Sequence, residues 1–132
     1  MIPTGTRPRR LILAATVAMA SSAAAQISRT ELVRAPLDGI EQGAGAVVRV
    51  ELPPGGATDR HRHPGQEYVY VVSGSIVIEP DGAAPVALAA GQARVNPANE
   101  VHRVRNPSRR RAARVIVVAL IPQGSPAVIP AE

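Results

Sequence analysis

The chain of 132 residues has no cysteine, no phenylalanine, no tryptophan and no lysine, and it has only two tyrosines. Without cysteine there is neither a disulfide nor a thiolate ligand for a soft metal, and a lipoprotein anchor is excluded. Stability must therefore come from a core of valine, alanine, isoleucine and leucine. The lack of phenylalanine and tryptophan favours a small polar ligand over a large flat aromatic one, which would need such rings for stacking.

Every cationic side chain other than histidine is an arginine, and the chain has 15 arginines against 10 acidic residues. Three of those arginines precede residue 26, so the rest of the chain has 12 arginines against the same 10 acidic residues. This small excess gives no support to a nucleic-acid partner. The cluster Arg109–Arg111 is predicted to form a solvated turn, and an anionic partner or a membrane surface is the alternative.

The first 25 residues have the layout of a secretory signal peptide. Arginines precede an apolar stretch from Leu11 to Ala20, and the small residues Ala23–Ala25 form a cleavage site before Gln26. We therefore expect a periplasmic or secreted protein with no stable membrane insertion after cleavage. An uncleaved anchor and a wrongly assigned start site are the alternatives. The pair Arg9–Arg10 resembles a twin-arginine motif, which would direct export of the protein in a folded state.

Residues 26–132 are predicted to form one all-β domain, because short β-prone runs alternate with glycine and proline and no amphipathic helix is evident. The barrel core is expected over about 46–121. Residues 37–45 are expected to be a loop, and the tail 122–132 is expected to be loose or draped on the surface. The predicted strands cover residues 27–33, 46–52, 57–63, 67–72, 75–79, 85–88, 92–96, 101–105 and 114–121, with a hairpin turn at Asp81-Gly82.

All three histidines of the chain lie in one window, together with a glutamate. His61 and His63 are two residues apart, so on a strand both imidazoles point to the same side. Glu67 follows after a short turn, and His102 comes from a later strand. Imidazoles and carboxylates are ligands for borderline divalent metals, so the pattern predicts a single metal site on a β scaffold.

The spacing around these residues resembles the two-part signature of the cupin superfamily. The first part reads Gly55-(5)-His61-x-His63-(3)-Glu67-(6)-Gly74, where bracketed numbers count intervening residues, and the second reads Gly91-(5)-Pro97-(4)-His102-(3)-Asn106. The local sequence around the first part is similar to that of small single-domain cupins with a His-x-His-Pro-Gly-x-Glu core. One position departs: Asn99 stands where the family has glycine. Asparagine tolerates a left-handed turn conformation, so the turn is expected to persist.

The resemblance implies a double-stranded β-helix, the cupin jelly-roll barrel, with one divalent transition metal (manganese, iron, copper, nickel or zinc). It implies four ligands, His61, His63, Glu67 and His102, which leave two positions of a six-coordinate ion open for a small-molecule substrate, or for substrate plus dioxygen. In some metal-dependent cupin dioxygenases the matching glutamate takes a proton, so Glu67 is also a candidate catalytic residue. A homodimer is expected by the same resemblance.

Three functions remain open from the sequence. The first is a metal-dependent enzyme of the dioxygenase or isomerase type that acts on a small oxygenated molecule. The second is a non-catalytic protein that binds metal or a small ligand such as a sugar or an organic acid. The third is a structural protein that keeps a vestigial site.

Two tyrosines and one aspartate near the predicted ligands have weaker assignments. Tyr68 and Tyr70 alternate with Glu67, so they are predicted to point away from the metal and to pack between sheets or at a subunit interface. Asp59 has the same strand parity as His61 and is a candidate partner for the second ring nitrogen of a ligand histidine; the alternative is a solvated turn residue.

The strand predicted over 92–96 carries two polar residues whose direction has to be inferred. Ala93 and Val95 are expected to supply the buried face, which would leave Arg94 and Asn96 in solvent. The alternative is that Arg94 or Asn96 makes a polar contact to a substrate.

Overall fold

The computed structural model describes residues 26–132, so the predicted signal peptide lies outside the described residues. Within this range the chain forms ten strands and connecting turns, which confirms the all-β prediction. The described residues include no helix with the length and apolar character that crossing a membrane requires.

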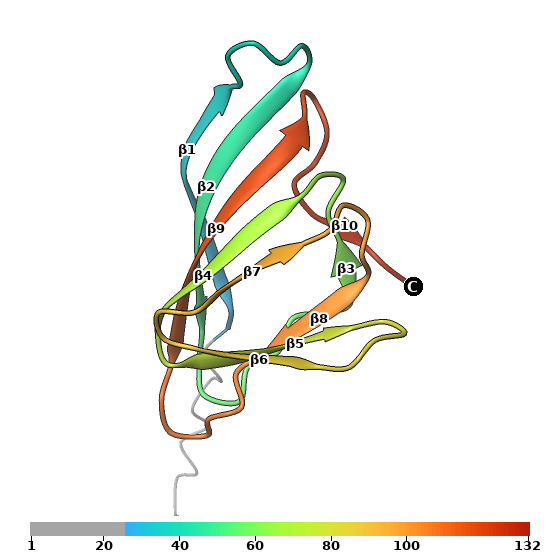
Figure 1. Ribbon diagram of the computed structural model, residues 1–132. Helices are drawn as coiled ribbons and strands as arrows, with labels where there is room; N and C mark the ends of the chain where they lie inside the picture. Colours follow the sequence, from blue (N-terminus) through green and yellow to red (C-terminus); the bar gives the residue numbers. More distant parts are fainter. Residues whose placement is uncertain (1–25) are drawn as a thin grey trace, which may run out of the picture.

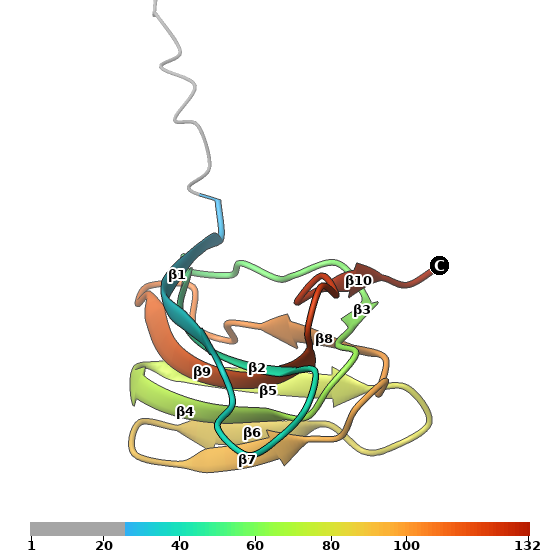
Figure 2. The same cartoon turned by 90° about the horizontal axis from the view of Figure 1, so that it is seen from above.

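The strands form two antiparallel five-stranded sheets that face each other (Figures 1 and 2). The first sheet has the order β1-β2-β9-β4-β7 and the second has the order β10-β3-β8-β5-β6. The strands are β1 (Ser28–Pro36), β2 (Gly43–Leu52), β3 (His61–Arg62), β4 (Glu67–Ser73), β5 (Ser75–Pro80), β6 (Val86–Ala89), β7 (Ala93–Asn96), β8 (His102–Arg105), β9 (Ala113–Pro122) and β10 (Ile129–Pro130). Strand β2 begins at Gly43, so the predicted loop over 37–45 is shorter than expected.

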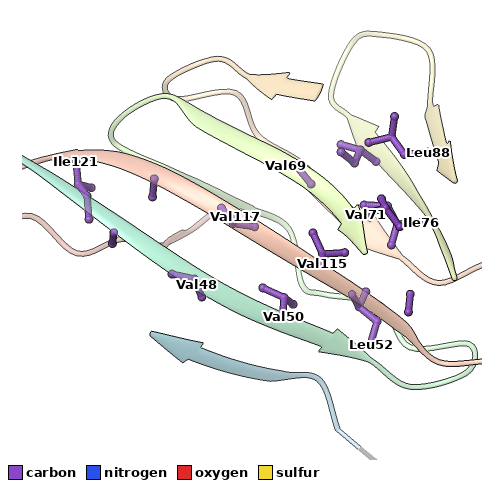
Figure 3. Packing of buried hydrophobic residues seen from close by; sticks show 14 residues of the cluster. Val48, Val50, Leu52, Val69, Val71, Ile76, Leu88, Val115, Val117 and Ile121 are labelled. Atoms are coloured by element: carbon purple, nitrogen blue, oxygen red, sulfur yellow. The ribbon is translucent and has the colours of Figure 1, made fainter. Parts of the chain in front are cut away.

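The core lies between the two sheets and is entirely aliphatic (Figure 3). Strand β2 shows the alternation that builds it: Val48, Val50 and Leu52 are buried, whereas Arg49 and Glu51 lie on the outer face. Strand β9 follows the same period and pairs with β2 along its whole length. The period of two is what the sequence predicts for strands with one buried face.

Two asparagines of the signature have structural positions. Asn99 has a φ of 62°, so the residue that replaces glycine does adopt the left-handed conformation. Its backbone N–H donates to the carbonyl of His63 over 2.8 Å, which ties the turn before β8 to a candidate ligand. Asn106 is buried, and its side-chain amide donates to the carbonyls of Leu52, Pro53 and Arg111. These hydrogen bonds connect the end of β2 to the turn before β9, and Asn106 does not line the cavity at the histidines.

The C-terminal tail lies along the surface of the barrel, which is the draped form of the prediction and not the loose one. Ile129 and Pro130 form β10, which pairs with His61 and Arg62 of β3 (Figure 1). Ala127 packs against the hydrophobic core. The prolines of the tail suggested an irregular segment, but a two-residue edge strand needs little β-propensity once a partner strand is present.

Gly65 lies in the turn between β3 and β4, where the chain passes close to β9. A Cβ atom at this position would overlap the backbone carbonyl oxygen of Leu120. The neighbouring Gln66 carbonyl accepts a hydrogen bond from the Leu120 N–H over 2.9 Å, so the two backbones are held together. Neither backbone can move away without loss of this bond.

We therefore expect Gly65→Ala to lower the free energy of unfolding by more than about 3 kcal/mol, because backbone must shift to relieve the overlap. Gly82→Ala is the control. Gly82 has a positive φ, 69°, but a Cβ atom added there would have no other atom within 4 Å, so its cost should be about 1 kcal/mol. Urea denaturation followed by circular dichroism measures both. Equal costs for the two variants would contradict the packing argument.

Candidate metal centre

The four predicted ligands come together between the two sheets. His61 lies in β3 and is the direct cross-strand partner of His102, the first residue of β8. His63 follows β3, and Glu67 begins β4 in the opposite sheet. All four side chains are buried, with exposed fractions between 1% and 7%.

The imidazole rings are close enough to share one ion. Their centroids are 4.9 Å apart for His61 and His63, 4.7 Å for His61 and His102, and 5.3 Å for His63 and His102. One ligand nitrogen from each of the three histidines lies within 4.8 Å of the others. The Nε2 atom of His63 is 3.0 Å from Oε1 of Glu67. Two ligand atoms about 2.1 Å from one ion, at right angles to each other, are about 3 Å apart, so this pair fits a shared metal.

Two of the histidines are held in an orientation suited to a ligand. Nδ1 of His61 is 2.8 Å from the carbonyl oxygen of Asp59, and Nδ1 of His63 is 2.6 Å from the carbonyl oxygen of Ala127. A carbonyl can only accept, so each Nδ1 carries the proton and Nε2 faces the centre of the site. The side chain of Asp59 is exposed, so the candidate role of this carboxylate as a partner of a ligand histidine is wrong; the contact with His61 comes from the backbone carbonyl.

His102 is held differently. Its Nδ1 is buried and has no hydrogen-bond partner within residues 26–132. The nearest acid is Glu100, whose Oε1 lies 3.6 Å away, beyond hydrogen-bond length. Glu100 is itself paired with Arg94 over 3.0 Å. Sequence reasoning did not identify Glu100, since a glutamate two residues before a histidine carries no specific signal.

Burial favours the neutral form of two of the histidines, His61 and His102. Loss of solvation lowers the pKa of His102 to about 4, and the nearby His61 and His63 contribute to this shift because a second imidazolium would be repelled. Burial also lowers the pKa of His61, against the opposing effect of its hydrogen bond to Asp59. Neutral imidazole is the form that binds a metal, so these two histidines would lose little proton charge on metal binding at neutral pH.

Glu67 is held as a carboxylate by its neighbours. Burial alone would raise the pKa of Glu67, but the contact with His63, the hydrogen bond from Asn96 and the positive charge of Arg29 outweigh it, so the pKa lies below its usual value. The Nδ2 atom of Asn96 donates to Oε1 of Glu67 over 3.3 Å. The ionised carboxylate is the form that a metal would use.

The prediction of which side chains on β7 are buried is wrong. Asn96 is only 1% exposed and faces the site, Arg94 is half-buried beside Glu100, and Ala93 and Val95 are on the outer face. The cause is register: Asn96 is the direct partner of Glu67 in β4, so the two side chains share the inner face.

Two other predictions about side-chain direction are confirmed. Tyr68 and Tyr70 point outward, with exposed fractions of 46% and 47%. The cluster Arg109–Arg111 is exposed, as expected for a solvated turn.

Comparison with protein families assigns the chain. The cupin domain family matches residues 48–119, more than half of the sequence, and this span includes all four predicted ligands. The chain belongs to the cupin superfamily. No curated protein matches it.

Solved structures support the same fold. The TT1209 protein of Thermus thermophilus is 27% identical, with a TM-score of 0.57, and the match covers 74% of this chain and 85% of that one. An uncharacterised protein with a double-stranded β-helix domain from Klebsiella pneumoniae is 19% identical, with a TM-score of 0.63 and coverages of 83% and 90%. The DMSP lyase DddQ of Ruegeria pomeroyi is also 19% identical, with a TM-score of 0.63, over 80% of this chain and 51% of that one. The last two matches show a common fold.

The cavity of this cupin at the histidines is small and has mostly aliphatic walls. Its volume is about 30 Å³, which is room for about two water-sized groups. The polar groups that line it are the three histidines, Glu67, Asn96, Thr58 and Arg29; the rest of the lining is Val50, Leu52, Val69, Ile76, Val104, Val115 and Val117. Three buried, convergent imidazoles could hold a metal ion here, and the absence of thiolate favours a borderline or hard ion.

The tail contributes to the site through the carbonyl of Ala127, which contacts His63. Deletion of residues 124–132 removes the acceptor of His63 Nδ1 and lets this ring rotate. We expect metal affinity to fall by about 10- to 100-fold, the usual consequence of losing an orienting partner of a ligand histidine. Deletion of Glu132 alone is the control. Isothermal titration with Zn²⁺ measures the affinity, and circular dichroism verifies folding. A folded deletion variant with unchanged affinity would show that the tail does not orient His63.

Proposed function

We propose that this cupin binds one divalent transition metal ion through His61, His63, Glu67 and His102 and acts on a small oxygenated molecule. The observation that carries the proposal is the convergence of three imidazoles, with the carboxylate of Glu67 beside His63, in a buried and mostly aliphatic cavity. Burial of four polar groups is costly unless they are paired or coordinate a metal. A buried cluster of three histidines and a glutamate is better explained by metal binding than by stability.

The metal, when bound, would supply Lewis-acid or redox chemistry, and the protein would supply position and a dry environment. The carbonyls of Asp59 and Ala127 orient two of the histidines. Asn96 holds one oxygen of Glu67 and leaves the other free of a hydrogen bond within residues 26–132. Among the described residues Glu67 is the one carboxylate that lines the cavity, so it is also the candidate to accept a proton from a substrate.

One observation favours a non-catalytic binding protein as the second candidate. Apart from the four proposed ligands, the polar side chains that line the cavity are Asn96, Thr58 and Arg29. The Thr58 hydroxyl already accepts the backbone N–H of Val104 over 2.9 Å. None of these three groups is a general base near neutral pH. If Glu67 stays on the metal, the site would bind a ligand without transforming it.

Elemental analysis of the purified protein tests the proposal. We expect about one metal ion per chain, lost in the double variant His61→Ala, His102→Ala and retained in Arg110→Ala, a change in the exposed turn. Equal metal content in all three proteins would refute the metal site. Oxygen uptake with a panel of small hydroxy acids and diketones then separates the two candidates: turnover supports the enzyme, whereas a thermal shift with ligand but no turnover supports the binding protein.

The outer face of the first sheet bears on the expected homodimer. Tyr68, Tyr70, Val72 and Val95 are large apolar side chains that are 40% or more exposed. Tyr68 and Val95 are direct cross-strand partners, and Tyr70 lies on the same face, so these side chains form a continuous patch over β4 and β7. Such a patch is typical of a surface that another protein covers. We propose that a second copy of the chain covers it.

Sedimentation equilibrium or light scattering after gel filtration measures the oligomer. We expect a dimer that Tyr70→Glu converts to a monomer, because burial of an unpaired carboxylate at the interface is costly. The control is Ala87→Glu, an exposed position on β6 of the other sheet. A monomeric wild-type protein, or dissociation by the control alone, would exclude this face as the interface.

A further inference from the structure

Arg29 reaches the cavity from the edge strand β1. It is the direct cross-strand partner of Val50, whose side chain is buried in the core. Residues directly opposite each other in an antiparallel pair point to the same face of the sheet. Ile27 has the same parity and packs against the core. The backbone of β1 therefore directs Arg29 toward the inner face, although the strand itself is exposed.

Two further observations place the guanidinium at the site. Arg29 lines the same cavity as His61, His63 and Glu67. Its positive charge also contributes to lowering the pKa of His61 and that of Glu67, in each case as a smaller effect than burial and hydrogen bonding. Because Arg29 is exposed as a residue while the four predicted ligands are buried, it lies at the mouth of the cavity.

No acidic side chain among residues 26–132 lies within 4.0 Å of the Arg29 guanidinium, and this group makes no hydrogen bond within that range. Other arginines of the chain are paired. Arg34, on the same strand, contacts Glu31 over 2.8 Å, and Arg94 contacts Glu100 over 3.0 Å. The described part of the protein thus leaves the donors of Arg29 available to a ligand.

Charge balance favours an anionic ligand. Three neutral imidazoles and one carboxylate would leave a divalent ion with one uncompensated positive charge, and Arg29 adds a second. Two positive charges beside an aliphatic cavity attract an anion, because the low dielectric strengthens their field and no protein acid within residues 26–132 pairs with Arg29. The small cavity limits the part of the ligand that enters to a few atoms.

We propose that Arg29 binds the carboxylate of a small organic acid at the mouth of the metal site. The planar guanidinium matches a planar carboxylate with two parallel hydrogen bonds, which a tetrahedral anion meets less well. The aliphatic walls around the site accept the short carbon chain of such an acid. This inference rests on the proposed metal site, and it names the substrate class and the residue that selects it.

The test uses Co²⁺-loaded full-length protein, titrated with propionate and with its uncharged analogue propionamide. Calorimetry and the visible spectrum of the Co²⁺ ion report binding without any need for turnover. We expect propionate to bind at least about 10-fold more tightly than propionamide, and Arg29→Gln to lose about 10- to 100-fold in propionate affinity, as expected for a charged hydrogen-bonded pair. Arg29→Lys keeps the positive charge but cannot form two parallel hydrogen bonds, so its propionate affinity should lie between those of the wild type and Arg29→Gln.

Arg34→Gln is the matched control: an exposed arginine on the same strand that is paired with Glu31. It should leave both affinities unchanged, and Co²⁺ content should be equal in all variants. Equal propionate affinity in wild type and Arg29→Gln, with Co²⁺ bound in both, would overturn the role of Arg29 and leave the metal site intact. Equal or tighter binding of sulfate would overturn the assignment to carboxylates. Failure of the wild type to bind Co²⁺ would instead overturn the proposed metal site, and the inference with it.

Discussion

The structure depends on burial of three imidazoles and a carboxylate between two aliphatic sheets. Each of these groups would lose several kilocalories per mole of hydration without compensation, so each needs a partner inside the protein. Asp59 and Ala127 provide carbonyls, and Asn96 provides an amide. His102 is the exception, because its Nδ1 has no hydrogen bond within residues 26–132. The segment before β3, the strand β7 and the tail supply these partners.

The aliphatic barrel makes that arrangement rigid. Val48, Val50 and Leu52 of β2 pack with the equivalent face of β9, and stiff β-branched side chains fill the space that aromatic rings would otherwise occupy. Gly65 lets the turn between His63 and Glu67 lie directly against the backbone of β9. The distance between these two side chains is therefore set by backbone contacts of the barrel and not by a mobile loop.

Much of this arrangement could be predicted from the sequence, because the signals concerned are local or have fixed spacing. The alternation in β2 and β9 and the shared direction of His61 and His63 follow from strand period. The left-handed turn at Asn99 follows from the family signature, which has glycine there, and from the tolerance of asparagine for this conformation. The spacing of the two-part signature groups His102 and Glu67 with that pair, although strand period alone does not bring a residue so distant in sequence to the same site.

The partners of the ligands could not be predicted, for physical reasons. Asp59 and Ala127 act through backbone carbonyls, which every residue has, so these contacts cannot be recognised from the residue type. The direction of Asn96 is set by its register with Glu67, and β7 has too few residues for hydrophobicity to reveal its buried face. Arg29 lies far from the ligands in sequence, and only the pairing of β1 with β2 brings it to the cavity.

Two of the residues that the sequence did not reveal, Arg29 and Ala127, lie outside the part of the chain that holds the four proposed ligands. The barrel between β2 and β9 holds all four proposed ligands, so it sets their positions. Strands β1 and β10 lie outside this span (Figure 2). Nevertheless β1 carries Arg29, which lines the cavity, and β10 follows the segment whose carbonyl orients His63. Both are edge strands of their sheets, so changes in them would leave the core packing intact. If Arg29 binds the ligand as proposed, the choice of ligand depends on the edge strand β1, and changes confined to that strand would alter it while the barrel stays the same.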